Sequence, residues 1–176
     1  QESLPNGESG VARIEESKKV LQQWRKNNPN SILHLEIAST QDTTIRKHLL
    51  DHMVNQVDSI GFNERELIDI LEVIDEKEFA GVCNKNTNSS NLFNGMLKVF
   101  KYTGCPRMQL HMFGLYITLQ KKGFKITPIQ NRKGMQLAAN IAATKTGTGS
   151  INSKDILLWS KGEKVSDQGL AELKNL

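Results

Sequence analysis

Acidic residues are absent from a long middle segment of this sequence. Residues 79–154 contain no Asp or Glu, but they hold 11 Lys and Arg residues and therefore carry a net charge of +11. Residues 1–78 carry −6, whereas the whole chain of 176 residues carries only +4. A segment with charges of one sign attracts anions, so this pattern indicates an anionic partner.

Long apolar runs and cysteines are also scarce. No run approaches the roughly 18 residues of a membrane-spanning helix, and the first residues lack the apolar core of a signal peptide. Cys83 and Cys105 are the only cysteines and do not have C-x-x-C spacing. We therefore expect reduced thiols and a location inside the cell, in the cytoplasm or nucleus.

The motifs of common catalytic sites are missing as well. There is no G-x-S-x-G nucleophile motif. Residues 144–150 read TKTGTGS, so the lysine comes before the glycines and G-x-x-x-x-G-K-[ST] is absent. We therefore expect no enzyme and no cofactor, and we interpret residues 144–150 as a flexible polar loop.

Two histidines are spaced for one face of a helix. His48 and His52 stand four residues apart, and Asp51 precedes the second. Such a pair can chelate one ion, and a structural site would need further ligands such as Cys83, Cys105 or His111. Asp is shorter than the Glu that activates water in H-x-x-E-H enzymes. The sequence favours ordinary helix histidines, and we predict no metal.

The hydrophobic periodicity predicts a mainly helical α+β fold. Apolar residues at helical spacing indicate five or six helices, one of which runs from about residue 39 to a stop at Gly61. Asn63 and Glu66 resemble a capping box that begins the next helix. Residues 32–37 alternate between apolar and polar, which is typical of a half-buried strand, so we expect one isolated or edge strand.

A small hairpin is expected near residues 115–129. Residues 121–123, Lys-Lys-Gly, would form its loop, because Gly123 can adopt the positive φ that such loops need. The predicted organisation is a flexible lead-in (1–8), a single globular domain (9–160) with an acidic half (9–78) and a basic half (79–154), and a C-terminal tail or short helix (161–176).

The basic segment favours a non-catalytic nucleic-acid-binding protein, with RNA the preferred partner. Cations neutralise phosphates and aromatic rings stack on bases, and both kinds of side chain are interleaved here. The predicted contact residues are Lys98, Lys101, Tyr102, Arg107, Tyr116, Lys121, Lys122, Lys125, Arg132, Lys133 and Lys145.

Two other interpretations of the basic segment stay open at this point. It could belong to a self-associating assembly, adaptor or matrix-like protein that binds an acidic protein or an anionic membrane surface, with homo-oligomers formed through the oppositely charged halves. Alternatively, the lysines could only keep one face solvated, or pair with the acidic outer face of the helix after Asn63.

Overall fold

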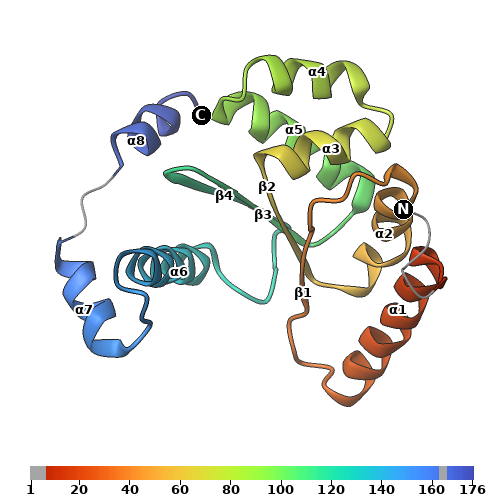
Figure 1. The fold of residues 1–176 in the computed structure, drawn as a ribbon, viewed down its shortest axis with the longest axis horizontal. Helices are drawn as coiled ribbons and strands as arrows, with labels where there is room; N and C mark the ends of the chain where they lie inside the picture. Colours follow the sequence, from red (N-terminus) through yellow and green to blue (C-terminus); the bar gives the residue numbers. More distant parts are fainter. Residues whose placement is uncertain (1–6, 163–165) are drawn as a thin grey trace.

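The computed structural model describes residues 7–162 and 166–176, and these form eight α-helices, one short 3-10 helix and a four-stranded sheet (Figure 1). The helices are α1 (Gly10–Asn27), α2 (Thr43–His52), α3 (Glu64–Val73), α4 (Lys77–Lys85), α5 (Ser89–Thr103), α6 (Pro128–Thr148), α7 (Ser153–Gly162) and α8 (Asp167–Leu173). The strands are β1 (His34–Glu36), β2 (Ser59–Asn63), β3 (Arg107–Met112) and β4 (Leu115–Gln120), and the 3-10 helix is η1 (Val54–Gln56).

The sheet is mixed and has the order β1-β2-β3-β4. The first three strands are parallel, with Leu35 beside Ile60 and Phe62 beside Leu110. The last strand returns antiparallel to β3. Helix α2 connects β1 to β2, and helices α3, α4 and α5 connect β2 to β3. The carboxyl ends of the three parallel strands therefore lie at one edge of the sheet.

One face of the sheet carries the hydrophobic core. Ile60, Phe62, Met108 and Leu110 alternate inward along β2 and β3 and are completely buried. Helices α3 and α5 pack directly on these strands, and α4 and α2 pack against α3. The core therefore lies between the sheet and this helical layer, which Figure 1 shows above and to the right of the strands.

The other face of the sheet meets α6, which is shown end-on in Figure 1. This helix begins where the sequence provides strong start signals. The Thr127 side chain accepts a hydrogen bond from the backbone N–H of Gln130, the Gln130 side chain accepts one from the backbone N–H of Thr127, and Pro128 occupies the first turn. Helix α7 packs on α6, and α8 packs near β4 and α5.

The predicted fold of five or six helices with one edge strand and a hairpin is wrong, chiefly because the sequence pattern hid β2. The predicted helix from residue 39 to Gly61 is in fact α2, η1 and the first half of β2. Met53, Val57 and Ile60 fit helical spacing and are buried, but Met53 lies between α2 and η1, Val57 follows η1 and Ile60 lies in β2. β1 does lie at an edge, but it pairs in parallel with β2 in a mixed sheet of four strands.

The predicted hairpin is displaced along the chain. Its actual turn is Phe113–Gly114, between β3 and β4, and Gly114 has the positive φ of 78°. Residues 121–127 instead lead into α6. The predicted loop at 144–150 is mostly the last turns of α6, which ends at Gly149 with φ 72°.

The predicted domain boundaries stay a prediction. Residues 1–6 of the lead-in and residues 163–165 of the tail lie outside the described residues, while α8 lies within residues 161–176. Strand β2 of the acidic half and strand β3 of the basic half are neighbours in one sheet. Within the described part of the chain, no helix is long and apolar enough to cross a membrane.

Candidate active site

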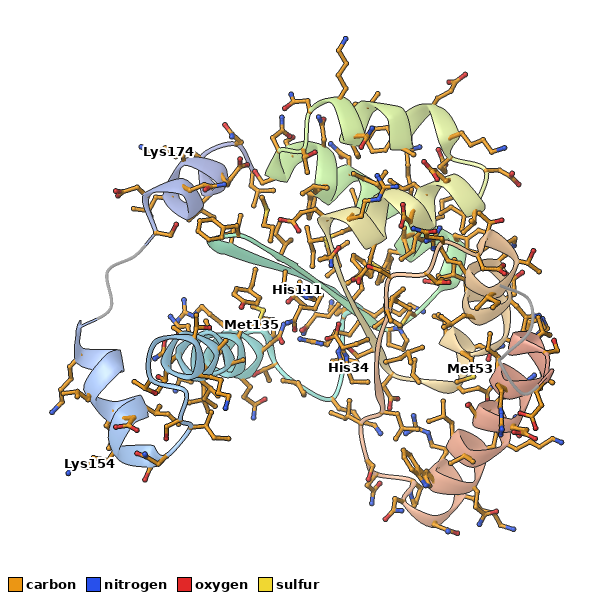
Figure 2. The ribbon with its side chains drawn as sticks, in the orientation of Figure 1. His34, Met53, His111, Met135, Lys154 and Lys174 are labelled. Atoms are coloured by element: carbon orange, nitrogen blue, oxygen red, sulfur yellow. The ribbon has the colours of Figure 1, made fainter. Side chains whose placement is uncertain are left out.

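The sheet face opposite the core is polar, which is unusual for a sheet whose strands are mostly parallel. Side chains alternate between the two faces along each strand. The residues next to Ile60 and Met108, and the corresponding residues of β1 and β4, therefore lie on this second face. We call it the polar sheet face; it is made by His34, Glu36, Ser59, Gly61, Asn63, Arg107, Gln109, His111, Tyr116, Thr118 and Gln120. Figure 2 shows His34 and His111 at the sheet, on the side where Met135 of α6 lies.

Glu36 lies over its neighbour strand at the point where that strand has a glycine. A Cβ atom on Gly61 would come within 2.3 Å of Glu36 Oε1, so only glycine leaves room for this carboxylate. His34 Nε2 lies 2.7 Å from Glu36 Oε1, and His34 Nδ1 lies 2.8 Å from Ser59 Oγ. The hydrogen bond from His34 lowers the pKa of Glu36, more than partial burial raises it.

Arg107 is the buried cation of this face. Its guanidinium donates to Ser59 Oγ at 2.7 Å, to Gln109 Oε1 at 2.6 Å and twice to Asn131 Oδ1 of α6. Burial lowers the pKa of Arg107, which nevertheless stays charged at neutral pH. Between α6 and this part of the sheet lies a cavity of about 310 Å³, lined in part by His34, Arg107 and Met135.

The carboxyl edge of the parallel strands continues this polar face. β2 ends at Asn63, whose side chain accepts from Glu66 N at 2.9 Å, while Glu66 Oε2 accepts from Asn63 N at 2.8 Å. Ser39, just beyond β1, donates to Glu66 Oε1 at 3.0 Å. Glu64 Oε1 accepts from the backbone N–H of Phe113, just beyond β3. Side chains that follow three parallel strands are therefore tied together at one edge.

This arrangement can bind a charged small molecule. In open α/β sheets, ligands bind in the crevice outside the carboxyl ends of the strands. A helix N-terminus such as that of α3 favours phosphate oxygens, and carboxylates such as Glu36 favour hard cations. The edge thus offers both types of group that a phosphorylated ligand with its cation requires.

The structure distributes the predicted nucleic-acid contacts over several elements. Lys98 pairs with Glu76 Oε2 at 2.9 Å, at the start of α4, and lies over the Phe79 ring, while its side chain stays 36% exposed. Tyr102 donates to Asp51 at 2.7 Å and contacts Lys47. Lys101 is exposed on the same helix α5.

The remaining predicted residues lie along β3, β4 and α6. Arg107 is buried beside the cavity between α6 and the sheet, and Tyr116 is half-buried on β4. Lys121 donates to Gly104 O and Lys145 to Gly149 O, each at the end of a helix. The exposed cations without such a described contact are Lys122, Lys125, Arg132 and Lys133. Of the whole predicted set, only Arg107 and Tyr116 lie on the polar sheet face.

The sequence interpretation missed the residues that do converge there. His34 and Glu36 were assigned to the outer face of a strand, and Asn63 and Glu66 only to a helix cap. The available signal was the polar residue that recurs at every second position in β1 and β3. It could not be used because β2, which joins these two strands, was not recognised.

The two cysteines add nothing to this site. Cys83 and Cys105 are free and buried, and burial raises the pKa of both thiols. Reactive cysteines need a lowered pKa and access to solvent, so both behave as small core residues.

Comparison with known proteins connects this geometry to a family. Residues 1–169 match the model of the conserved region of ADP-specific phosphofructokinase/glucokinase. The chain is 28% identical over 178 residues to an ADP-specific phosphofructokinase of Methanosarcina acetivorans, covering 99% of this chain and 36% of that protein. It is 33% identical over 139 residues to an ADP-dependent glucose/glucosamine kinase of Pyrococcus furiosus, covering 77% and 29%.

Solved structures agree with these sequence matches. The reconstructed last common ancestor of ADP-dependent phosphofructokinases from Methanosarcinales is 27% identical and superimposes with a TM-score of 0.89 over 99% of this chain and 36% of its own. An ADP-dependent kinase solved with fructose-6-phosphate and ADPβS gives the same identity and TM-score, over 99% and 38%. The chain thus spans between 29% and 38% of the length of the four proteins named here.

These relatives are enzymes, and their similarity overturns the functional predictions from charge. The non-catalytic nucleic-acid-binding protein, the RNA partner and the alternative of a self-associating adaptor or matrix-like protein are all wrong. The net positive segment was a weak indicator, because electrostatics alone does not distinguish one anion from another. The family match, the fold and the sequence relatives agree, and the chain belongs to the ADP-specific phosphofructokinase/glucokinase family.

Proposed function

We propose that the protein carrying this chain is a sugar kinase that transfers a phosphoryl group from ADP to a hexose or hexose phosphate. The relatives named above are ADP-dependent kinases for fructose 6-phosphate or for glucose and glucosamine. The observation that carries the proposal in this chain is the polar carboxyl edge of the sheet, where β1 ends at Glu36 and β2 ends at Asn63, which pairs with Glu66.

Phosphoryl transfer depends on positioning and on charge neutralisation, with little covalent chemistry for the protein to perform. Hydrogen bonds hold side chains in place at the carboxyl edge of the sheet. Glu66 is almost fully buried and both of its oxygens accept hydrogen bonds, so it holds Ser39 and the start of α3 in place. We therefore assign Glu66 the role of positioning the groups at the carboxyl edge of the sheet.

Glu36 fits the cation that kinases require. Its Oε1 is engaged by His34, and no described residue donates a hydrogen bond to its Oε2. The side chain is 57% exposed, and its lowered pKa keeps it ionised at neutral pH. Magnesium in kinases is bound by one or two carboxylates together with substrate phosphates and water. Glu36 would hold this ion, which when bound neutralises charge on the transferred phosphoryl group.

AMP release tests this proposal directly. The intact protein that carries this sequence is incubated with ADP, Mg²⁺ and either fructose 6-phosphate or glucose, with ATP replacing ADP in a parallel reaction. We expect sugar-dependent AMP formation from ADP with one of the two acceptors. Folded protein that forms no AMP with either acceptor would contradict the proposal, and the preferred acceptor distinguishes phosphofructokinase from glucokinase activity.

A further inference from the structure

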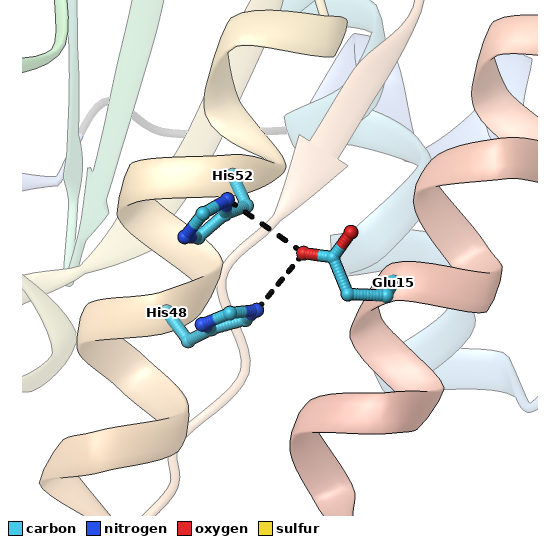
Figure 3. Close-up of side chains that lie close together, drawn as sticks. All are labelled: Glu15, His48 and His52. Carbon is cyan, nitrogen blue, oxygen red and sulfur yellow. Dashed lines mark hydrogen bonds and ion pairs between the residues drawn. The ribbon is translucent and has the colours of Figure 1, made fainter.

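A second cluster of metal-ligating side chains lies away from the polar sheet face, on the outer helices. Glu15 of α1 faces His48 and His52 of α2, and Figure 3 shows both imidazole rings directed at the same carboxylate oxygen. Among the described residues, this is the group of three His, Cys, Asp or Glu side chains whose ligand atoms all lie within 4.8 Å of one another.

The distances suit a metal ion better than a pair of hydrogen bonds. Glu15 Oε1 lies 3.0 Å from His48 Nε2 and 3.6 Å from His52 Nδ1. The first distance is a hydrogen bond, but the second is too long for one. Ligand atoms around tetrahedral zinc are separated by roughly 3.3 Å, given bonds of about 2.0–2.1 Å. The two distances lie on either side of that value. The His48 and His52 rings are stacked with their centroids 4.0 Å apart, so both rings would turn towards each other to share one ion.

The surroundings also favour a cation. His52 is the last residue of α2, where the carbonyl groups of the helix end carry partial negative charge. The three side chains are 22–42% exposed, which leaves access for the ion and for a water molecule as a further ligand. Lys18 is a cation that could compete with a metal ion for Glu15, and its Nζ lies 3.6 Å from Glu15 Oε2.

We propose that Glu15, His48 and His52 bind one Zn²⁺ ion, which clamps α1 to α2. Two imidazoles and a carboxylate are a known three-residue ligand set for zinc, with water in the fourth position. Helix α1 has no fully buried residue; Leu21 packs against the core, and polar contacts such as the Arg25–Asp58 ion pair and the Gln22–Gln56 hydrogen bond join α1 to the body. Because the ligands come from two helices, the binding free energy stabilises the docking of α1.

Calorimetric titration with Zn²⁺ alone tests the site in protein first stripped of metal with a chelator. We expect one equivalent of zinc per chain, with affinity reduced by at least about tenfold in each of Glu15→Gln, His48→Gln and His52→Gln. Glu16→Gln is the matched control, because Glu16 is the next acid on α1 and pairs with Arg13. This control keeps wild-type affinity. Circular dichroism without zinc verifies that each variant is folded.

Hydrogen exchange gives a second measurement that does not depend on kinase activity. Zinc should slow amide exchange in residues 10–27 of the wild-type protein and leave it unchanged in His48→Gln. The proposal is overturned if wild-type protein binds no zinc stoichiometrically, or if the three ligand variants bind it as tightly as Glu16→Gln. Affinity lost only in His111→Gln would place the ion on the sheet and would equally overturn it.

Discussion

At the scale of single residues, the position of the Glu36 carboxylate depends on a side chain that the neighbouring strand lacks. Gly61 has no Cβ, and the Glu36 carboxylate occupies the space where that atom would be. Because the carboxylate is at the end of the flexible, exposed side chain of Glu36, it can move aside without disturbing the core. The glycine therefore determines the position of the carboxylate, with little effect on the stability of the sheet.

Gly61→Ala separates these two roles. We expect the free energy of unfolding to change by less than about 1 kcal/mol, because alanine is tolerated in strands and only Glu36 must shift. Kinase activity of the intact protein should fall by about tenfold or more, since a displacement of about 1 Å in a positioning group has effects of that size. Gly81→Ala in α4 is the control, because nothing lies within 4 Å of its added Cβ. Equal activity in the two variants would contradict the role given to Glu36.

Asp58 joins α1 to the segment before β2, and the contribution of this contact to stability depends on pH. It accepts from Arg25 Nη2 at 2.5 Å and from the backbone N–H of Leu33 at 2.8 Å. Burial by itself would raise the pKa of Asp58, but these two hydrogen bonds and the charge of Arg25 outweigh burial, and the pKa lies below its ordinary value. A lowered pKa in the folded state gives stability that is present above the unfolded pKa of about 3.9 and lost as pH falls below it.

Asp58→Asn should therefore cost about 1–2 kcal/mol of unfolding free energy at pH 7, as expected for a hydrogen bond to a charged group. The difference from wild type should shrink as pH falls through about 4 towards 3. Urea unfolding of both proteins across this range measures it. A difference that stays constant with pH would show that the charge of Asp58 is not what stabilises the contact.

At the scale of elements, the sequence predicts helices better than strands. α5 was visible because its apolar residues recur at helical spacing over 15 residues, between an Asn cap and Gly104. β2 was not, because five residues are too few to show a period, and Asn63 reads equally as the end of a strand or the cap of a helix. The correct hairpin needed a choice between Gly114 and Gly123, which both have positive φ and which only strand pairing distinguishes.

Helix α6 is joined to the sheet by the polar contact between Asn131 and Arg107, which no sequence pattern predicts. Asn131 accepts two hydrogen bonds from the buried guanidinium of Arg107, so the contact joins residues 24 positions apart. Asn131→Ala removes the acceptor and leaves part of a buried cation unpaired. We expect a loss of about 1–3 kcal/mol in the free energy of unfolding.

Hydrogen exchange in α6 should also become faster in Asn131→Ala, while exchange in α5 changes less. Arg132→Ala, one position along and exposed, serves as the control and should leave both measurements close to wild type. If the two variants behaved alike, α6 would be held by contacts other than Arg107.

At the scale of the whole molecule, the distribution of charge along the chain does not indicate where the candidate site lies, whereas the order of the strands does. The basic segment runs from α4 through α5, β3, β4 and α6 to the start of α7, so its cations are distributed over several elements, and two of them bind Glu76 and Asn131. The residues that converge come instead from the ends of parallel strands, which are far apart in sequence. Charge counting cannot detect such a site, because convergence depends on strand order.

The central claim is that Glu36, at the carboxyl edge of the sheet, holds the cation for phosphoryl transfer from ADP. The most direct test is the Mg²⁺ dependence of AMP release by the intact protein, compared between Glu36→Gln and Glu16→Gln. We predict that kcat falls about 100-fold or more in Glu36→Gln, because charge stabilisation by a metal is worth several kcal/mol, while its melting temperature and the activity of Glu16→Gln stay near wild type. Wild-type kcat and Mg²⁺ dependence in folded Glu36→Gln would contradict the claim.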